Sequence, residues 1–266
     1  MAKKKDPSIT FLNKFGYNVI KLPRVGIEPL DVIGSDTSNQ WLGPLRTVWK
    51  SKVAEPTPGA PRPAAAVSGQ RTDQLDLSFG LKILANALAA FGATVPSLDF
   101  AFTRARSVQF SYTDVTSTVV PPFDAGEYLK AGSLSSDNPV VKHYFVDPDA
   151  EAFLIIDVLK SASITVTASD QHGAGVSVDV PAIQGVVGAN VSVKANSTNN
   201  DTLTFTGKTP VSFGFTVDRI QFDGTSWSLS GEAPSGALSF GTAGAGGQAP
   251  PVAPILLGSG CQVSLS

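Results

Sequence analysis

The stretch "FLIIDVL", from Phe153 to Leu159, begins the part of the chain that decides the fold. A continuous apolar run of this length is typical of a β-strand that is buried on both faces. Just beyond it the pattern changes to alternation, with Ile164, Val166 and Ala168 on one side and Ser or Thr on the other. Such a two-residue period predicts a strand with one buried face and one polar face.

The same period returns in several segments as far as residue 217. Taken together, the polar residues that alternate with the apolar side chains are mostly Ser and Thr. These apolar positions are Val176, Val178 and Val180; Val191, Val193 and Ala195; Leu203 and Phe205; and Val211, Phe213, Phe215 and Val217. The second half of the chain is therefore predicted to be rich in antiparallel strands.

Two interpretations of this alternation stay open. An antiparallel sheet with one solvated face would produce it. Strands that line a membrane barrel, with lipid on one side and a lumen on the other, would produce it too. The uncharged hydroxyls of the polar faces favour the second interpretation, because they tolerate a change of surroundings.

Helices and further strands are predicted in the first half of the chain. Asp6 and Pro7 form a helix start, since aspartate caps well and proline suits the first helical position. A second helix is predicted over 78–93, with Leu81, Leu84 and Leu88 near one face. The remaining predictions are strands over 17–22, 29–34 and 105–115, a loop over 55–69 and a short helix over 121–132.

Composition excludes several classes of function. The net charge is −2 and only 16% of residues are charged, which gives no electrostatic footprint for nucleic acid. The single cysteine, Cys261, permits no internal disulfide and favours a reducing, cytoplasmic compartment. Neither a signal peptide nor an apolar run of about 18 residues is present. His143 and His172 have no metal-ligand spacing, and no catalytic motif or phosphate loop occurs, so we expect no cofactor and no enzyme activity.

The C-terminal tail has an unusual composition. No charged side chain follows Glu232. Residues 241–251 read "GTAGAGGQAPP", which is typical of a flexible linker. The linker leads to the apolar cluster "VAPILLG", and we expect Ile255, Leu256 and Leu257 to dock on the body of the protein.

The N-terminal segment "DPSITFLNKFGYNVIKLPRVGIEPLDVIG", from Asp6 to Gly34, closely resembles the N-terminus of the bacterial gasdermins. The resemblance continues in "RTDQLDLSFGLKILANALAAFGA", "DNPVVKHY" and "VDVPAIQGVVGANVSVKA", and it covers nearly the whole chain. It implies an α+β fold, with a twisted antiparallel central sheet and surrounding helices. It also implies a pore-forming domain over 1–240, followed by a linker and an autoinhibitory peptide over 241–266.

The resemblance also implies partners and a location. The inactive monomer would be cytoplasmic, and an activating protease, often caspase-like, would remove the C-terminal peptide. The freed protein would meet membrane lipids and form a homo-oligomeric pore in the inner membrane, so that the cell dies and phage spread stops. The alternative from another class is a soluble β-rich binding module with a protein-interaction tail.

One departure from the family concerns the N-terminus. Characterised bacterial gasdermins often carry an S-acylated cysteine within the first few residues, whereas this chain has Lys3, Lys4 and Lys5 there. No N-terminal acylation site is therefore expected, and Cys261 should not inherit the role. The three lysines could contact anionic lipid headgroups, at about 1 kcal/mol each, or simply be solvated.

Two regions are expected to form membrane-inserting hairpins, Leu75 to Val115 and Leu159 to Thr206. Family resemblance suggests both, and the alternation supports the second. The side chains predicted to insert are Leu81, Leu84, Leu88, Ile164, Val166, Val176, Val178, Val191 and Val193.

The activating cut is expected between Leu238 and Pro254. Because no Lys, Arg, Asp or Glu lies in that window, the protease must accept an uncharged residue before the cut. The large side chains Leu238 and Phe240 rank first. The small residues of the linker, including Thr242, Gly244 and Gly246, rank lower.

Overall fold

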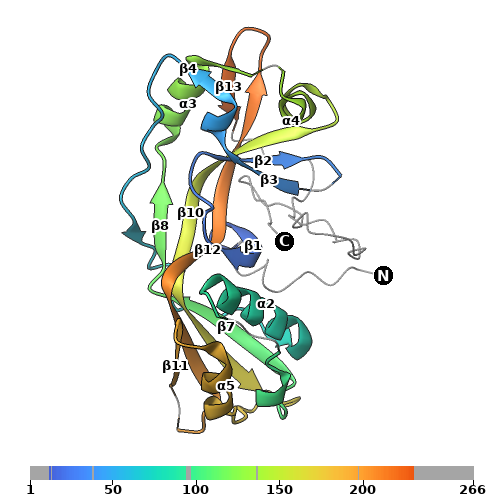
Figure 1. Cartoon of the computed structure of the whole chain (residues 1–266), viewed down its shortest axis with the longest axis vertical. Coiled ribbons are helices and arrows are strands. Elements are labelled where there is room, and N and C mark those ends of the chain that lie inside the picture. Colours follow the sequence, from blue (N-terminus) through green and yellow to red (C-terminus); the bar gives the residue numbers. More distant parts are fainter. Residues whose placement is uncertain are drawn as a thin grey trace.

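Two long strands form the axis of the protein in this computed structural model (Figure 1). They are β10 (Glu151–Ser169) and β12 (Thr202–Phe222), which run antiparallel and pair along most of their length. The register shifts at irregularities between Ile155 and Asp157, between Leu159 and Lys160, and between Ser161 and Ser163. The structure describes residue 12 and residues 14–37, 39–93, 97–135, 137–196 and 198–230.

The other strands of the 11-stranded sheet add to this axis at three levels. At the upper end in Figure 1, β2 (Asp31–Ser35) pairs with β10 and with β3 (Asn39–Pro44), while β13 (Trp227–Ser230) pairs with β12. In the middle, β1 (Asn18–Arg24) pairs with β12 and β8 (Thr116–Val119) pairs with β10. At the lower end, β7 (Ser107–Thr113) pairs with β10 and β11 (Val191–Ala195) pairs with β12.

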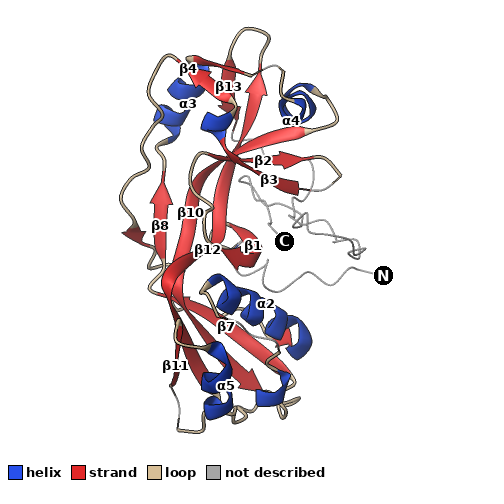
Figure 2. Ribbon diagram, in the orientation of Figure 1, coloured by secondary structure: helices blue, strands red, loops and turns tan. Residues whose placement is uncertain are grey.

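Helices cover the two ends of the sheet (Figure 2). The lower end carries α2 (Leu77–Ala90), α5 (Val180–Val187) and the short η2 (Asp99–Ala101); the upper end carries α3 (Pro122–Lys130), α4 (Pro139–Val141) and the π-helix η3 (Lys142–Val146). The remaining short elements are η1 (Leu45–Thr47), β4 (Trp49–Ser51), β5 (Arg62–Pro63), β6 (Leu75–Asp76) and β9 (Gly132–Leu134). The α+β class, with a large antiparallel sheet and surrounding helices, is confirmed.

The apolar run of β10 contributes to two cores at its upper end and, through Leu159, to a third. Phe153 and Ile155 belong to a central cluster, whereas Leu154 and Ile156 belong to the upper one. All the residues from Ala152 to Leu159 are buried, so the predicted burial on both faces is confirmed. A third and larger cluster lies at the lower end of the sheet in Figure 1, beneath α2. This end of the molecule is called the lower lobe below.

Most predicted elements of the first half are present. The helix predicted over 78–93 is α2, and Asp76 caps it by accepting a hydrogen bond from the Ser78 N–H at 3.0 Å. The predictions over 17–22, 29–34, 105–115 and 121–132 correspond to β1, β2, β7 and α3. The helix predicted to start at Asp6 lies largely outside the described residues.

The proline-rich segment predicted as a loop runs along the outer edge of β7 and β8 as an edge strap, residues 59–76. Its backbone N–H groups at Gly59, Ala64 and Gly69 donate to the carbonyls of Val119, Val115 and Tyr112, each at 2.8 Å. The short strands β5 and β6 belong to this strap and pair with β8 and β7. Backbone groups that would otherwise be open at a sheet edge are thereby satisfied.

A glycine allows α2 to approach the sheet closely. A Cβ atom added at Gly80 would lie 2.1 Å from Val108 Cγ2 on β7. We therefore expect Gly80→Ala to lower the free energy of unfolding by about 1–3 kcal/mol, as overpacked cores do. Urea denaturation would measure the change.

Gly126→Ala in α3 is the matched control, because nothing lies within 4 Å of an added Cβ there. In that helix alanine should raise the stability by about 0.5–1 kcal/mol. Equal effects of the two substitutions would contradict the close packing of α2 on β7.

Candidate membrane-inserting site

The two regions expected to insert into a membrane form the lower lobe together (Figure 1). Hydrogen-bonded neighbours in its sheet are β11, β12, β10, β7 and β6, in that order. Residues 75–115 supply β6, α2 and β7, while residues 159–206 supply the lower part of β10, α5, β11 and the start of β12. Segments far apart in the sequence therefore share one sheet and one core.

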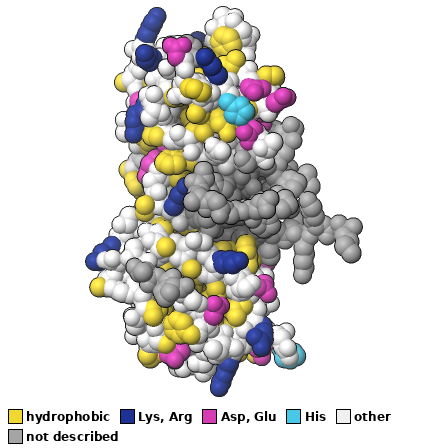
Figure 3. Space-filling model, turned by 45° about the vertical axis from the view of Figure 1, so that its right-hand side comes forward, with side chains coloured by type: hydrophobic (Ala, Val, Ile, Leu, Met, Phe, Trp, Pro, Cys, Tyr) yellow, Lys and Arg dark blue, Asp and Glu magenta, His cyan; other side chains and the backbone are white. Residues whose placement is uncertain are grey.

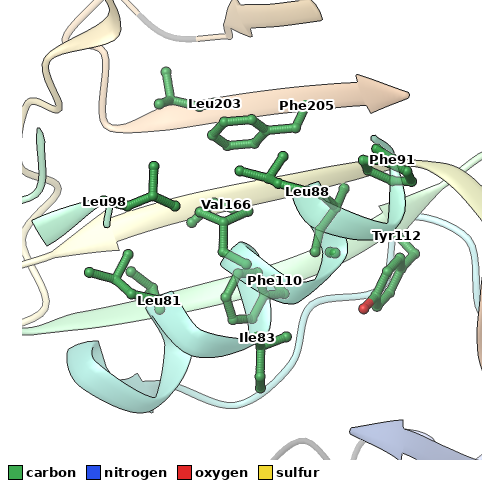
Figure 4. Close-up of a cluster of buried hydrophobic side chains, with 14 of the residues drawn as sticks. Leu81, Ile83, Leu88, Phe91, Leu98, Phe110, Tyr112, Val166, Leu203 and Phe205 are labelled. Atoms are coloured by element: carbon green, nitrogen blue, oxygen red, sulfur yellow. The ribbon is translucent and has the colours of Figure 1, made fainter. Parts of the chain in front are cut away.

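The inner face of this sheet is apolar, and most of it is buried. Val166, Leu203 and Phe205 on the long strands have exposed fractions of 1% or less. Figure 4 shows Leu81 and Leu88 of α2 pointing toward the side chains of Phe110, Val166 and Phe205. Leu84 is buried in the same cluster, so the predicted helical face of Leu81, Leu84 and Leu88 is confirmed.

The outer face of the same strands carries a ladder of hydroxyl pairs. Across β10 and β12, Thr165 Oγ1 lies 2.7 Å from Thr204 Oγ1. The pairs above and below it are Ser163 with Thr206 at 3.3 Å and Thr167 with Thr202 at 3.2 Å. The strands thus separate an apolar face from an uncharged polar face, as the alternation predicted.

The predicted inserting residues of the second region divide into two groups. Ile164 and Val166 lie on β10, and Val191 and Val193 lie on β11. All four point to the lower core, although Val193 is only partly buried. Their alternation with polar neighbours is therefore confirmed for the folded protein.

The strand predicted around Val176, Val178 and Val180 is wrong for this structure. Val176 and Val178 lie in an irregular segment, and Val180 is the first residue of α5. The Asp179 side chain caps this helix by accepting a hydrogen bond from the Ala182 N–H at 3.1 Å, and Pro181 lies in its first turn. The capping aspartate and the proline both favour the start of a helix. Together these signals outweigh the short alternation of valines. Val178 still packs in the lower core.

A buried carboxylate was missed by sequence reasoning. It lies midway along β10, where β8 pairs with β10 and β1 pairs with β12, and this part of the molecule is called the waist below. Asp157 of β10 has an exposed fraction of 8% and accepts two hydroxyl hydrogen bonds. Tyr17 Oη donates to its Oδ2 at 2.6 Å, and Ser117 Oγ donates to its Oδ1 at 2.7 Å. These bonds join the chain before β1 and strand β8 to the central strand. The sequence does contain one signal of this site, because Asp157 is the single acidic residue in the apolar run "FLIIDVL".

His143 also has partners that its sequence neighbourhood does not reveal. Its Nε2 lies 2.9 Å from Asp36 Oδ2 in the β2–β3 turn, and its Nδ1 lies 3.4 Å from Asp147 Oδ2. The hydrogen bond to Asp36 is the main cause that raises the pKa of His143. Within the described part of the chain, no group of three or more His, Cys, Asp or Glu side chains is placed to hold a metal ion.

Neither the charges on the face shown in Figure 3 nor the helices mark out one region of the described residues. Figure 3 shows basic and acidic side chains spread along the visible face, with hydrophobic side chains between them. Among the residues that the structure describes, no helix is both long and apolar enough to cross a membrane.

Several predicted functional residues lie outside the described residues. They are the lysines Lys3, Lys4 and Lys5, the cleavage residues Leu238, Phe240, Thr242, Gly244 and Gly246, the docking residues Ile255, Leu256 and Leu257, and Cys261.

These elements define an α+β fold in which helices cover the apolar face of amphipathic strands. A family model described as "Bacterial Gasdermin Family" matches residues 20–231. Gasdermin bGSDM of Vitiosangium sp. (strain GDMCC 1.1324) is 36% identical over 248 residues, which cover 92% of this chain and 92% of that protein. Gasdermin bGSDM of a Desulfuromonadales bacterium is 31% identical over 225 residues, which cover 82% of this chain and 83% of that protein.

A solved structure supports the fold. The structure of a bacterial gasdermin from Bradyrhizobium tropiciagri superposes with a TM-score of 0.63 at 16% identity, covering 99% of this chain and 98% of that chain. At this identity the likeness concerns the fold alone. On the family match and the curated relatives, the chain belongs to the bacterial gasdermin family. Membership of this family supports a pore-forming, cell-death function.

The waist cluster can be tested through Tyr17. Tyr17→Phe leaves one oxygen of the buried Asp157 without its donor, so we expect a loss of about 1.5–3 kcal/mol in the free energy of unfolding. Burial, with the Asp157 hydrogen bond, raises the pKa of Tyr17. The contribution of Tyr17 should therefore be complete below about pH 10, the ordinary tyrosine pKa, and decline above it.

Urea denaturation at neutral and alkaline pH would measure both effects. Tyr144→Phe is the control, since its hydroxyl makes only a 3.4 Å contact with Asp36. Tyr17 would have no structural role at the waist if both variants matched the parent protein at neutral pH.

Proposed function

We propose that this protein is an autoinhibited pore-former rather than an enzyme. Proteolytic removal of its C-terminal peptide allows it to oligomerise into membrane pores that kill the cell, in defence against phage. The observation that carries the proposal is the lower lobe of a gasdermin-family chain. Its strands present an apolar face to α2 and a hydroxyl face outward. A sheet of this kind can exchange its protein cover for lipid and keep every backbone hydrogen bond between strands.

The inactive protein is proposed to be a cytoplasmic monomer that reaches the inner membrane only after activation. The domain division follows, with the pore-forming part over 1–240 and the inhibitory tail over 241–266. The family model matches residues 20–231, which lie within the proposed pore-forming part. Lys3, Lys4 and Lys5 are proposed to assist binding to anionic headgroups.

The activating protease is proposed to cut after an uncharged residue. The window from Leu238 to Pro254 contains no charged side chain, so neither a trypsin-like enzyme nor a caspase that requires aspartate can cut there. Leu238 and Phe240 are the side chains large enough to fill an apolar specificity pocket. They precede the glycine-rich stretch, which can adopt the extended backbone that proteases bind.

Dye release from liposomes tests the function directly. A chain truncated near residue 245 should release dye from anionic vesicles, whereas the full-length chain should not. Val193→Asp in the truncated chain should largely abolish release, because a charge within the bilayer costs about 2–4 kcal/mol in each subunit. Val193 is a better test position than Val166, because Val166 is 1% exposed and a charge there would also unfold the soluble form.

Ser192→Asp is the matched control, since Ser192 is the exposed neighbour on the opposite face of β11. It should leave dye release near the parent level. A truncated chain that releases no dye would refute pore formation. Equal release from both aspartate variants would refute the insertion of β11.

The inhibitory tail can be tested without a protease. Burial of an apolar side chain contributes roughly 1.5–3 kcal/mol before ordering costs. Replacing Ile255, Leu256 and Leu257 together by serine should therefore release the tail and give toxicity on expression. Alanine at Ser259, Gly260 and Gln262 is the control and should stay silent. If the serine variant is as silent as the control, the inhibitory contact lies elsewhere.

A further inference from the structure

The outer face of the lower-lobe sheet is a continuous polar surface built from four strands. One row of directly opposed residues crosses β11, β12, β10 and β7, namely Lys194, Thr204, Thr165 and Ser111. The next row in the same strand order consists of Ser192, Thr206, Ser163 and Thr113. A third row contains Thr202, Thr167 and Gln109. Apart from Lys194, every one of these side chains is a neutral hydroxyl or amide.

Acidic residues are absent from the strand segments that make this face. Residues 107–113, 163–169, 191–195 and 202–208 contain no Asp or Glu. Their charged residues are Lys194 and Lys208, and both are exposed. The edge strap beside β7 carries both signs, with Arg71 and Asp73. Within the four strands themselves, the charge is therefore wholly positive.

The acidic residues nearest to these strands in the sequence lie just beyond the strand ends. Asp170 follows β10 and closes a turn, where it accepts a hydrogen bond from the His172 N–H at 2.8 Å. Asp201 precedes β12 and packs against Gly175 of the same turn region. Neither residue thus belongs to the rows of the outer face.

The charge of Lys194 is uncompensated in the resting fold. Among the described residues, no carboxylate oxygen lies within 4.0 Å of its amine. The Lys208 amine lies 3.3 Å from the side-chain oxygen of Asn190, which is a neutral partner. By contrast, Lys160 farther up β10 forms an ion pair with Glu28. Packing and ion pairing therefore give no account of the charge at Lys194.

The proposed pore gives this face an aqueous position. Because the apolar inner face would contact lipid, the outer face would line the lumen. Each subunit would then contribute one Lys194 at the same depth, so an assembly of subunits would carry a ring of ammonium groups. Rings of Lys or Arg favour anions in pores, since they attract anions and repel cations. The hydroxyl rows around such a ring add no charge of either sign.

We propose that Lys194 gives the pore lumen a preference for small anions, a class that includes phosphorylated metabolites. This inference rests on the proposed pore-forming function and specifies the solutes that the pore favours. The field of a fixed charge extends over about one Debye length, roughly 8 Å at physiological ionic strength and roughly 30 Å at 0.01 M. The preference is therefore largest in dilute salt.

Reversal potentials in planar bilayers test the preference. The chain truncated near residue 245 is added to a bilayer of the lipid composition used for dye release, under a gradient of dilute KCl. The sign of the potential at zero current tells whether chloride or potassium carries more of the current, whatever the number of pores. The parent truncated chain should favour chloride. Raising the KCl to about 1 M, where the Debye length is about 3 Å, should remove the preference.

Substitutions at Lys194 test whether this residue is the source. Lys194→Glu reverses the charge of the ring and should shift the reversal potential toward that of potassium. Lys194→Gln should leave a smaller chloride preference, and Lys194→Arg should match the parent because it keeps the charge. Lys52→Glu is the matched control, since it makes the same change of net charge at an exposed residue of the upper end. It should also match the parent.

Several results would overturn the inference. One is a parent pore that favours potassium, and another is an equal shift with Lys194→Glu and Lys52→Glu. Loss of pores in both Lys194→Gln and Lys194→Glu would show that Lys194 serves assembly instead, which would overturn it too. A parent truncated chain that carries no current would count against the proposed function rather than against the role of Lys194.

Discussion

The antiparallel pairing of β10 with β12 is the constraint on which the rest of the structure depends. Every other strand of the large sheet pairs directly with one of these two strands or with a strand that does. The register shifts along their ladder let the sheet change neighbours, from β2 in the upper part to β8 at the waist and β7 below. At the waist, Asp157 occupies one of these irregularities and is satisfied by Tyr17 and Ser117 from distant parts of the chain.

The two ends of this shared axis differ in how their faces are covered. In the upper part, both faces of β10 are buried and belong to separate cores. In the lower lobe, one face lies under α2 while the other carries paired hydroxyls that are partly exposed. Among the described residues, the lower lobe thus has a sheet with two chemically distinct faces, one of them covered by helices that include α2 and α5. A protein that acts in both water and lipid needs such a difference between its ends.

Local periodicity decided how much of this could be predicted. The runs in β10, β11 and β12 and the helical face of α2 were predicted correctly, because each pattern lies within one continuous segment. The segment from Val176 to Val180 was misassigned, because a few alternating valines competed with the helix-start signal of Asp179 and Pro181. The partners of Asp157 and His143 could not be predicted, since Tyr17 and Asp36 are brought to them only by the complete fold. The predicted tail contacts lie outside the described residues.

The edge strap at residues 59–76 has a consequence for how the protein can be stored. Open strand edges invite pairing between copies, and the tendency rises with concentration. The strap covers the outer edge of β7 and β8 through backbone hydrogen bonds at 2.8 Å, and its prolines have no N–H to offer to a further strand. A cell could therefore accumulate a reserve of this protein ahead of need, with little loss to aggregation along that edge.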